Sequence, residues 1–364
     1  MKNNQYCVIM AGGHLNRFWP ISREGMPGHF LDISGIGKSL VRMAYERCLG
    51  VVPEENILII TLGKFKGIIN EQIPELPKEN LLLEPYARRT APCIAYATYT
   101  LLKRNPDAVM AATPADIIVN DEQLFKETMT HALDYAEKNP VLVTLGVKPD
   151  RPDTEYGYIQ AVGGKGACSS GDPVKVKTFT EKPDAEIADV FFRSGEFFWN
   201  SGIFVWQASV IKEEMERYIP EITRLFDGWE GALGSPAEEV FIERAYTDCI
   251  KLSIDYGVME KTDRAWVYPI QFGWSDIDSW ENYYSSIRSK DQDGNISNTQ
   301  MKILQNDKRN IILTKNKNKL LMIRGLEDCL VVDTDDVLLI CPRDDKQYKE
   351  LVNSTRMPGY DKYR

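Results

Sequence analysis

The chain has 364 residues, an apolar fraction of 43%, a charged fraction of 27% and a formal net charge of −9. This length exceeds what one small core needs and predicts one large domain with a smaller second unit. The composition is that of a soluble globular protein, and the acidic balance excludes a general basic surface for nucleic acid.

Cysteine usage and the N-terminal run restrict the cellular setting. The seven cysteines are scattered, and no pair has C-x-x-C spacing, so the sequence indicates neither a disulfide framework nor a zinc site. The apolar run at residues 6–10 is too short for a signal-peptide core or a membrane span. We therefore expect a protein of the reducing cytoplasm, with no membrane partner and no nucleic-acid partner.

Strand and helix patterns alternate over the first 150 residues. Short apolar runs predict buried strands at residues 6–10, 56–61, 80–83, 108–112 and 141–147. Helical periodicity predicts helices at residues 38–49, 64–72, 90–102 and 124–138. The alternation predicts an α/β fold with a doubly wound, mostly parallel, Rossmann-like sheet. Ligands bind beyond the carboxyl ends of such strands, where Gly12, Gly13 and Asp116 are expected to lie.

The pattern is looser from residue 150 to residue 273, and the composition changes after Trp280. The middle part predicts strands at residues 155–162, 174–179, 202–206 and 265–269, and helices at residues 185–194, 209–218 and 240–245. Residues 290–298 predict a polar linker. Beyond it, apolar runs predict strands at residues 310–313, 319–323, 329–333 and 337–341, and a final helix is expected at residues 344–352. We expect a domain of residues 1–289 and a small β domain of residues 290–364.

The first predicted strand runs directly into a glycine turn, A-G-G-H-L-N-R, at residues 11–17. Glycines at a strand end allow backbone N–H groups to approach a phosphate, because no Cβ stands in the way. Arg17 and Arg23 supply fixed positive charge suited to phosphate oxygens. Many α/β proteins place two glycines after the first strand for steric reasons alone, so the turn by itself leaves both interpretations open.

Several further blocks follow in order along the chain. In chain order they are E-P-Y-A-R-R-T-A at residues 84–91, T-P-A-D-I at 113–117, T-L-G-V-K-P-D-R-P-D-T-E-Y-G-Y-I at 144–159 and F-T-E-K-P at 179–183. W-N-S-G-I-F-V-W at residues 199–206, S-I-D-Y-G-V-M-E-K at 253–261 and G-W-S-D-I-D-S-W at 273–280 complete the set. With residues 11–31, these blocks resemble the motifs of the bacterial mannose-1-phosphate guanylyltransferases, which are sugar-phosphate nucleotidylyltransferases. The resemblance covers nearly the whole chain. It implies a GT-A-like nucleotidyltransferase domain followed by a β domain of the left-handed β-helix type.

The resemblance implies transfer of GMP from GTP to mannose 1-phosphate, which gives GDP-mannose and pyrophosphate. Such a reaction depends on positioning two anions and neutralising their charge, and a divalent cation suits this task. The matching positions imply a catalytic role for Arg17 and Mg²⁺ ligation by Asp116 and Asp276. Either aspartate alone would equally suit a turn cap after a strand, and the pairing of both motifs favours the metal site.

The resemblance also implies binding positions for both substrates. The nucleotide positions are Ala11, Gly12, Gly13, Arg17, Glu84, Arg88 and Thr90. The sugar-phosphate positions are Gly157, Glu181, Lys182 and Asn200. Glu181 and Asn200 offer acceptors and donors for hydroxyl groups, and Lys182 offers a point charge for phosphate. A surface ion pair for Glu181 and Lys182, and a turn for Asn200, are the structural alternatives. A homodimer is one candidate assembly.

The chain departs from the family pattern at positions implied in nucleotide binding. Leu15 and Asn16 replace a glycine and a threonine or serine, and Gly28 and His29 replace a lysine and a glutamine. Losing one phosphate-binding cation costs about two or more orders of magnitude in rate. Arg89, in place of an asparagine, adds positive charge that would offset this loss in part.

Other departures are Ile117 for a histidine and Asp278 for a glycine. His14 and His29 are poor substitutes for a lysine, because a neutral imidazole carries no charge. Two further hypotheses therefore stay open. One is a catalytically weak or inactive homologue that binds a sugar phosphate or sugar nucleotide in a regulatory or partner role. The other is an enzyme with a different nucleotide or hexose 1-phosphate.

Overall fold

The computed structural model describes residues 1–13, 16–33, 35–164, 171–277, 279–287, 289–343 and 348–363. The chain forms two compact units, each built from separate stretches of sequence. The first comprises Met1–Gly13, Met43–Ala115 and Val119–Trp274, and the second comprises His14–Arg42, Asp116–Ile118 and Ser275–Arg364. The expected division at residues 289 and 290 stays a prediction.

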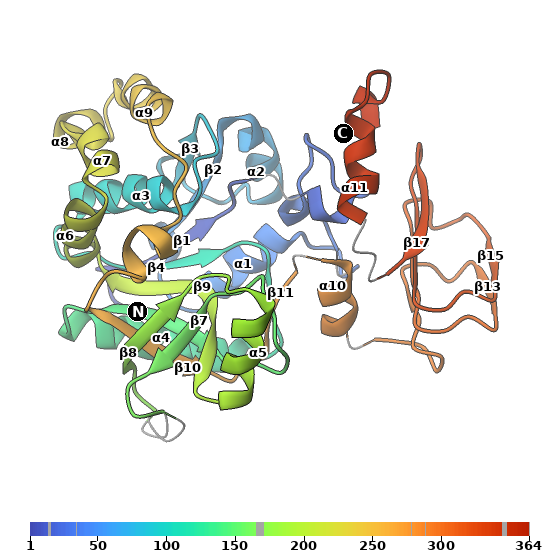
Figure 1. Ribbon diagram of the computed structural model, residues 1–364. Helices are drawn as coiled ribbons and strands as arrows, with labels where there is room; N and C mark the ends of the chain where they lie inside the picture. The colour runs from blue at the N-terminus through green and yellow to red at the C-terminus, as the bar shows by residue number, and fades with distance from the viewer. Residues whose placement is uncertain are drawn as a thin grey trace. The chain divides into compact units, whose positions relative to one another are not determined.

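A nine-stranded sheet forms the centre of the first unit (Figure 1). Its order is β3-β2-β1-β4-β9-β6-β10-β8-β7. The strands are β1 Gln5–Met10, β2 Ile57–Leu62, β3 Leu81–Glu84, β4 Val109–Pro114, β6 Leu142–Val147, β7 Tyr158–Ala161, β8 Val174–Thr180, β9 Phe197–Gln207 and β10 Ala265–Ile270. The five strands predicted in the first 150 residues all form, each within two residues of its expected bounds.

The direction of the strands differs in part from the expectation of a mostly parallel sheet. Strands β3, β2, β1 and β4 are parallel neighbours, as are β6 and β10. Strand β9 lies between β4 and β6 and is antiparallel to both, and β8 is antiparallel to β10 and to β7. The sheet is therefore mixed. An apolar run predicts a buried strand but not its direction, which depends on its neighbours in the fold.

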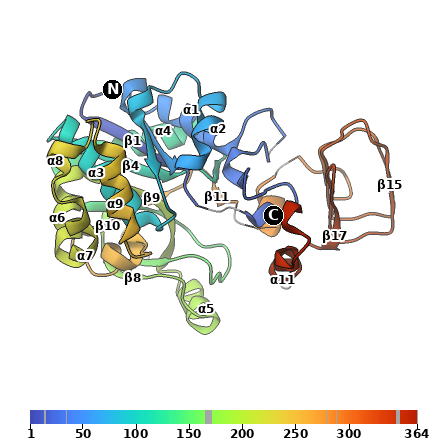
Figure 2. The same cartoon turned by 90° about the horizontal axis from the view of Figure 1, so that it is seen from above.

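Helices surround this sheet. They are α1 Leu40–Leu49, α2 Lys66–Gln72, α3 Thr90–Arg104, α4 Glu122–Lys138, α5 Ala185–Ser194, α6 Ala208–Tyr218, α7 Pro220–Thr223, α8 Trp229–Ala232 and α9 Glu238–Thr247. Helix α4 packs on the central strands β4, β6 and β9. Helices α3, α6, α7 and α8 lie side by side at one end of the unit (Figure 1 and Figure 2). No described helix combines the length and apolarity that a membrane span requires.

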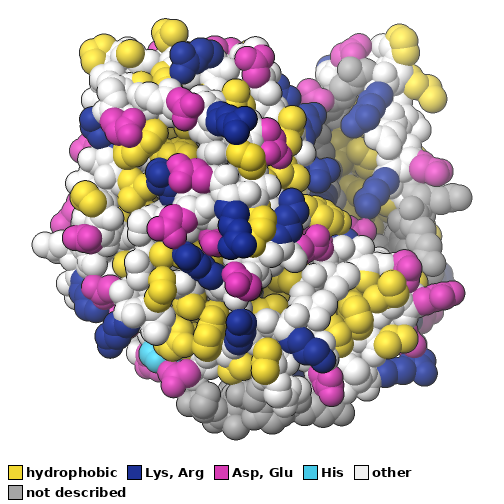
Figure 3. Space-filling view, turned by 60° about the vertical axis from the view of Figure 1, so that its left-hand side comes forward, with side chains coloured by type: hydrophobic (Ala, Val, Ile, Leu, Met, Phe, Trp, Pro, Cys, Tyr) yellow, Lys and Arg dark blue, Asp and Glu magenta, His cyan; other side chains and the backbone are white. Residues whose placement is uncertain are grey.

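Aromatic side chains fill much of the core of the first unit. Trp206 is fully buried and stacks on Phe204, and Trp199 is buried beside Tyr156. Charged side chains of both signs alternate over the face of this unit shown in Figure 3, and no large patch of one sign gathers there.

The second unit contains the predicted β domain. Strands β12 Ile296–Ser297, β14 Ile311–Thr314, β16 Cys329–Asp333 and β17 Leu338–Pro342 form one sheet, and β13 Lys302–Gln305 and β15 Leu321–Arg324 form a second. The chain alternates between the two sheets, and equivalent strands of successive coils pair in parallel (Figure 1). Two bridging residues of β12 lie within the stretch expected to be a polar linker. The final helix is α11 Tyr348–Asn353, and residues 344–347 of the expected helix lie outside the described residues.

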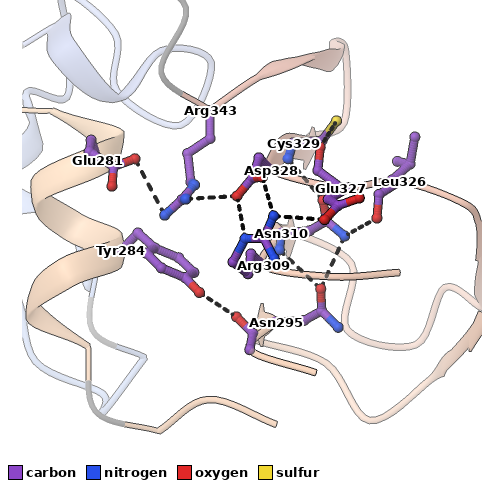
Figure 4. A network of polar contacts seen from close by, with 11 residues as sticks. Glu281, Tyr284, Asn295, Arg309, Asn310, Leu326, Glu327, Asp328, Cys329 and Arg343 are labelled. Carbon is purple, nitrogen blue, oxygen red and sulfur yellow. Dashed lines mark hydrogen bonds and ion pairs between the residues drawn. The ribbon is translucent and has the colours of Figure 1, made fainter. Parts of the chain in front are cut away.

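Arg343, whose side chain is 9% exposed, joins the β domain to helix α10 (Trp280–Ser286) within the second unit (Figure 4). The Arg343 guanidinium lies 3.5 Å from the centre of the Tyr284 ring and contacts carboxylates of Glu281 and Asp328 at 3.3 and 3.1 Å. The Asp328 carboxylate also accepts hydrogen bonds from the exposed Arg309. Arg343 is thus the least exposed arginine of a charged network that connects a helix with two β segments.

Candidate functional site

The glycine turn in the first unit is held by the neighbouring strand. The Ala11 N–H donates to the Ile60 carbonyl at 2.8 Å, and the Thr61 hydroxyl donates to the Ala11 carbonyl at 2.7 Å. Gly13 has a φ of 103°, which favours glycine. A Cβ at Gly12 would lie 2.7 Å from the Glu84 Oε2, so a side chain does not fit there. His14 and Leu15 lie outside the described residues, and Asn16 is described only in its backbone.

Glu84 at the end of β3 is a buried carboxyl beside this turn. It accepts a hydrogen bond from the Tyr246 hydroxyl of α9 at 3.0 Å. Burial raises the pKa of Glu84 to about 7, and the hydrogen bond from Tyr246 opposes that shift. The predicted nucleotide position therefore has a carboxyl that changes charge near neutral pH. Tyr246 was not among the predicted residues, since nothing in its sequence context distinguishes it from a core tyrosine.

The three residues around the start of α3 have different surroundings. The Arg88 guanidinium donates to the carbonyls of Tyr246 and Thr247 at 3.0 and 3.1 Å and lies over the Tyr86 ring. The Thr90 hydroxyl accepts from the Ile254 N–H at 2.9 Å. These contacts are architectural. Arg88 joins the end of α9 to the loop before α3, and Thr90 joins the segment after α9 to the start of α3.

Arg89 differs from both neighbours. Its backbone has φ 68° and ψ −166°, a region that residues other than glycine rarely adopt. Its side chain is exposed and makes no hydrogen bond or ion pair with the residues that the structure describes. The family's asparagine tolerates a positive φ better than arginine does. Arg89 is therefore a strained, solvent-accessible cation at the end of the E-P-Y-A-R-R loop.

Three of the predicted sugar-phosphate residues lie together in the first unit. The Asn200 N–H donates to the Gly157 carbonyl at 2.8 Å, which joins β9 to the loop before β7. A Cβ at Gly157 would collide with Glu181 Oε2 and lie 3.3 Å from the Asn200 Cβ. The spacing of these residues in the sequence, from 157 to 200, does not reveal this contact. The resemblance selected them individually, and the fold brings them into one cluster.

The Asn200 side chain is fixed by its hydrogen bonds. Its Oδ1 accepts from the Thr144 hydroxyl at 3.0 Å and from the Gly202 N–H at 3.2 Å. Its Nδ2 donates to Asp255 Oδ1 at 2.8 Å. One N–H of the amide thus remains for a ligand. Asp255 begins η8 Asp255–Met259, a π-helical turn of a kind frequent at functional sites. The predicted residues did not include Thr144 or Asp255, although both lie in the quoted blocks.

Carboxyl groups crowd around this cluster. Burial and the nearby charge of Asp255 raise the pKa of Glu181 to about 8. Burial raises the pKa of Asp255 to about 6, while the hydrogen bond from Asn200 opposes the shift. Glu260 accepts a hydrogen bond from the Glu181 N–H at 2.8 Å. Lys182 has a φ of 46° and lies 3.9 Å from the Glu155 carboxylate. The cluster therefore combines a lysine with several groups that can bind hydroxyls.

The predicted metal ligands belong to the second unit. Asp116 directly precedes β5 Ile117–Val119, and Asp276 ends β11 Trp274–Asp276; these two strands pair with each other. The Ile277 N–H donates to the Asp116 carbonyl at 3.2 Å, so the two aspartates lie on adjacent segments of backbone. Both residues are half-buried. Their carboxylates are hard oxygen donors of the kind that Mg²⁺ prefers.

No three His, Cys, Asp or Glu side chains of the described part of the chain gather into a ready-made metal site. A pair of carboxylates is sufficient where substrate phosphates and water complete the octahedron. Ile117, in place of the family's histidine, is buried in β5. Asp278 lies outside the described residues.

Arg17 lies in a short helical turn, η1 Asn16–Phe18, and is exposed. The C-terminal segment of the second unit holds the backbone around it. The Tyr348 hydroxyl donates to the Trp19 carbonyl at 2.5 Å, and the Trp19 indole N–H donates to the Tyr363 carbonyl at 2.8 Å. Sequence reasoning missed this support, because about 330 residues separate the partners. Gly28 and His29 are buried in η2 Gly28–Phe30, so His29 offers no accessible imidazole.

Known proteins resemble this chain in sequence and in fold. The family model described as "Nucleotidyl transferase" matches residues 6–293. The mannose-1-phosphate guanylyltransferase of Escherichia coli K12 is 35% identical over 99% of this chain and 75% of its own length. The xanthan biosynthesis protein XanB of Xanthomonas campestris is 34% identical over 97% of this chain and 73% of its own length.

A solved structure from Thermus thermophilus, described as a mannose-1-phosphate geranyltransferase, superposes with a TM-score of 0.83. It is 28% identical, and the match covers 97% of this chain and 99% of the other. The likeness thus includes the small β domain as well as the large sheet. On these grounds the chain belongs to the nucleotidyl transferase family and is a relative of the mannose-1-phosphate guanylyltransferases.

Proposed function

We propose that this protein transfers GMP from GTP to mannose 1-phosphate and thereby makes GDP-mannose and pyrophosphate. One observation carries the proposal. The half-buried side chains of Glu181, Asn200 and Asp255, with the backbone of Gly157, present hydrogen-bonding groups beside Lys182, as a phosphorylated sugar requires. This cluster lies in a chain that is 35% identical to a mannose-1-phosphate guanylyltransferase.

In the proposed reaction, an oxygen of the sugar phosphate attacks the α-phosphorus of GTP in line, and pyrophosphate leaves. Backbone N–H groups of Ala11, Gly12 and Gly13, with Arg17, hold the triphosphate. Glu84, Arg88 and Thr90 complete the nucleotide pocket, directly or by supporting it. Gly157, Glu181, Lys182 and Asn200 orient mannose 1-phosphate. Most of the acceleration would come from positioning and from neutralised charge.

We propose Mg²⁺ as the divalent cation that nucleotidyltransferases generally use, with Asp116 and Asp276 as its protein ligands. When bound, it would neutralise phosphate charge in the transition state. The half-buried carboxylates on paired strands support this assignment.

The remaining proposals concern organisation. We propose a functional division at residues 289 and 290, with left-handed winding of the β domain, to which the stacked parallel coils lend support. We propose a homodimer as the assembly, because apolar side chains of Ile303, Met322, Leu338 and Ile340 are exposed on the β domain. We propose the cytoplasm as the location, since GTP and sugar phosphates are used there.

A second candidate function rests on a specific observation. Gly28 occupies the family's lysine position and is buried in a short turn, so this position supplies no cation. A homologue with weak or no activity would then bind mannose 1-phosphate or GDP-mannose as a regulator or partner. A different base or hexose is the third alternative.

Pyrophosphate release by the purified protein tests these candidates. Each nucleoside triphosphate is paired with mannose 1-phosphate and with glucose 1-phosphate, in Mg²⁺ and in EDTA. We expect turnover with GTP and mannose 1-phosphate that EDTA abolishes. Binding of mannose 1-phosphate without turnover for any pair would favour the second candidate. Faster turnover with another pair would favour the third.

A further inference from the structure

The carboxyl of Asp255 occupies a position between two of the proposed sugar-binding residues. It accepts a hydrogen bond from Asn200 Nδ2 at 2.8 Å, and its charge adds to burial in raising the pKa of Glu181. Asn200 has both lone pairs of its Oδ1 occupied by Thr144 and Gly202, so its amide cannot turn over without breaking two further hydrogen bonds. The negative charge of this carboxyl pair is therefore best stabilised on Asp255.

Glu181 is in the opposite situation. Its buried Oε2 has no hydrogen-bond partner among the described residues, and it lies where a Cβ of Gly157 would be. A buried carboxylate oxygen without a donor is costly, whereas a neutral carboxyl loses far less on burial. Three carboxyls, from Glu181, Asp255 and Glu260, lie close together, and a dianionic sugar phosphate would be repelled if all three were ionised.

We propose that Asp255 is a positioning residue that orients the Asn200 amide and keeps Glu181 neutral, so that Glu181 offers one donor and one acceptor to the sugar hydroxyls. This inference rests on the proposed function, because it deepens the sugar-phosphate site. A neutral carboxyl can bind a hydroxyl in either role and adds no negative charge next to phosphate. An ionised carboxylate would only accept.

The other charged groups that face this pair come from several elements. Lys182, beside Glu181, lowers the pKa of both carboxyls, and Glu260 raises the pKa of both. The Tyr256 hydroxyl donates to the Glu181 carbonyl at 3.4 Å. The positive charge of Arg89, just before α3, opposes the rise that burial causes in the pKa of Tyr256. Glu155 lies 3.9 Å from the Lys182 ammonium. Substitutions at Glu181 and Asp255 leave all of these groups in place, so their effects on binding can be assigned to this pair of carboxyls.

Calorimetric binding of mannose 1-phosphate to the full chain at pH 7, 8 and 9 tests the proposal. The pKa of Glu181 of about 8 predicts that wild-type affinity falls about tenfold between pH 7 and pH 9, as this carboxyl ionises. Glu181→Gln imitates the neutral carboxyl. We expect it to bind within about threefold of the wild type at pH 7 and to keep that affinity at pH 9. A loss of affinity that is equal at all three pH values would overturn the proposal.

Asp255→Asn provides the second arm. The amide still accepts from Asn200 but removes the charge that adds to burial in raising the pKa of Glu181, so the fall in affinity should begin about one pH unit lower than in the wild type. If Asp255 had only a structural role, Asp255→Asn would weaken binding equally at every pH. The pH at which the affinity falls would then equal that of the wild type, and this result would contradict the proposal. Glu186→Gln, an exposed carboxylate on α5, is the matched control and should leave the profile unchanged. Titration of the ligand's own phosphate is common to all variants.

The same proteins are assayed for pyrophosphate release, so that the two proposals fail separately. The expected binding profiles without turnover would leave the inference standing and the proposed function refuted. If the enzyme turns over but the affinity of Glu181→Gln for mannose 1-phosphate still falls between pH 7 and pH 9, the inference is refuted and the proposed function stands. Absence of mannose 1-phosphate binding by the wild type at every pH would overturn the inference.

Discussion

Glycine and arginine are the residue types whose placement explains most of the site. Gly12 and Gly157 each lie against a carboxylate oxygen, of Glu84 and Glu181 respectively, at a position that a Cβ would occupy. At both places the absence of a side chain is what allows the backbone to approach a buried carboxyl. Arg89 shows the converse, because its side chain is accessible while its backbone is strained.

A methyl group at Gly157 tests the first of these features. In Gly157→Ala the Cβ would displace Glu181, so we expect the KM for mannose 1-phosphate to rise at least about tenfold, while the KM for GTP stays within about twofold. Steady-state kinetics with each substrate varied in turn measures this. Gly231→Ala is the control, since a Cβ there meets open space in the exposed helix α8. Equal KM values in the Gly157 variant and the wild type would contradict the site.

Substitutions at positions 89 and 28 test whether the charge of Arg89 replaces that of the family's lysine. If Arg89 offsets the lysine missing at position 28, Arg89→Asn lowers kcat/KM for GTP by about tenfold or more. Arg89→Lys keeps the charge and should lose less. Adding Gly28→Lys to Arg89→Asn restores the family residues at both positions and should recover the rate. If Arg89→Asn has the rate of the wild type, Arg89 has no part in phosphate binding.

At the scale of elements, hydrogen bonds between distant segments support the candidate site. The end of α9 is joined to the E-P-Y-A-R-R loop through Arg88 and through the Tyr246–Glu84 hydrogen bond. In the second unit, the C-terminal segment supports the backbone at Trp19, two residues beyond Arg17. Removal of a supporting element should therefore disturb residues far from it in sequence.

The Arg343 network in Figure 4 allows a matched comparison of two arginines that share Asp328. The Arg343 side chain is largely buried and lies over the Tyr284 ring, whereas Arg309 is exposed. Arg343→Met loses the stacking and both ion pairs, and we expect it to lower the free energy of unfolding by about 1–3 kcal/mol. Arg309→Met should change it little. Urea denaturation measures both, and equal effects would show that burial is unimportant in this network.

At the scale of the whole molecule, buried carboxyls make stability depend on pH. Glu84 has a pKa of about 7 in the folded chain, against an ordinary value of 4.5. Between these values the folded state holds a proton that the unfolded state has released. The free energy of unfolding therefore falls as pH rises from about 4.5 to about 7, and this contribution is constant above that range.

Glu84→Gln removes this dependence, because the amide stays neutral and still accepts from Tyr246. We expect the variant to exceed the wild type in stability by roughly 3 kcal/mol at pH 8 and to match it near pH 4.5. Urea denaturation at pH 5, 6, 7 and 8 measures the difference. A stability difference that does not grow with pH would show that Glu84 ionises normally in the folded chain.

Local sequence was sufficient for much of the first unit. Strands β1 to β4 and β6, and helices α3 and α4, form close to their predicted bounds, because buried strands and amphipathic helices have strong local signals. The family motifs likewise indicated Gly157, Glu181 and Asn200 individually. The sequence did not predict the antiparallel direction of β9, the two-residue strand β12 or the short pair β5 and β11. Each of these depends on a partner strand distant in sequence.

The amino-acid sequence alone determined the element types, the family and the residue types available for chemistry, because these follow from composition, periodicity and motifs. Only the tertiary structure decided which of them act together. It placed Asp255 on Asn200, Tyr246 on Glu84 and the C-terminal segment on Trp19. Burial and through-space charge then set the ionisation of Glu84, Glu181 and Asp255, and neither quantity exists until the chain has folded.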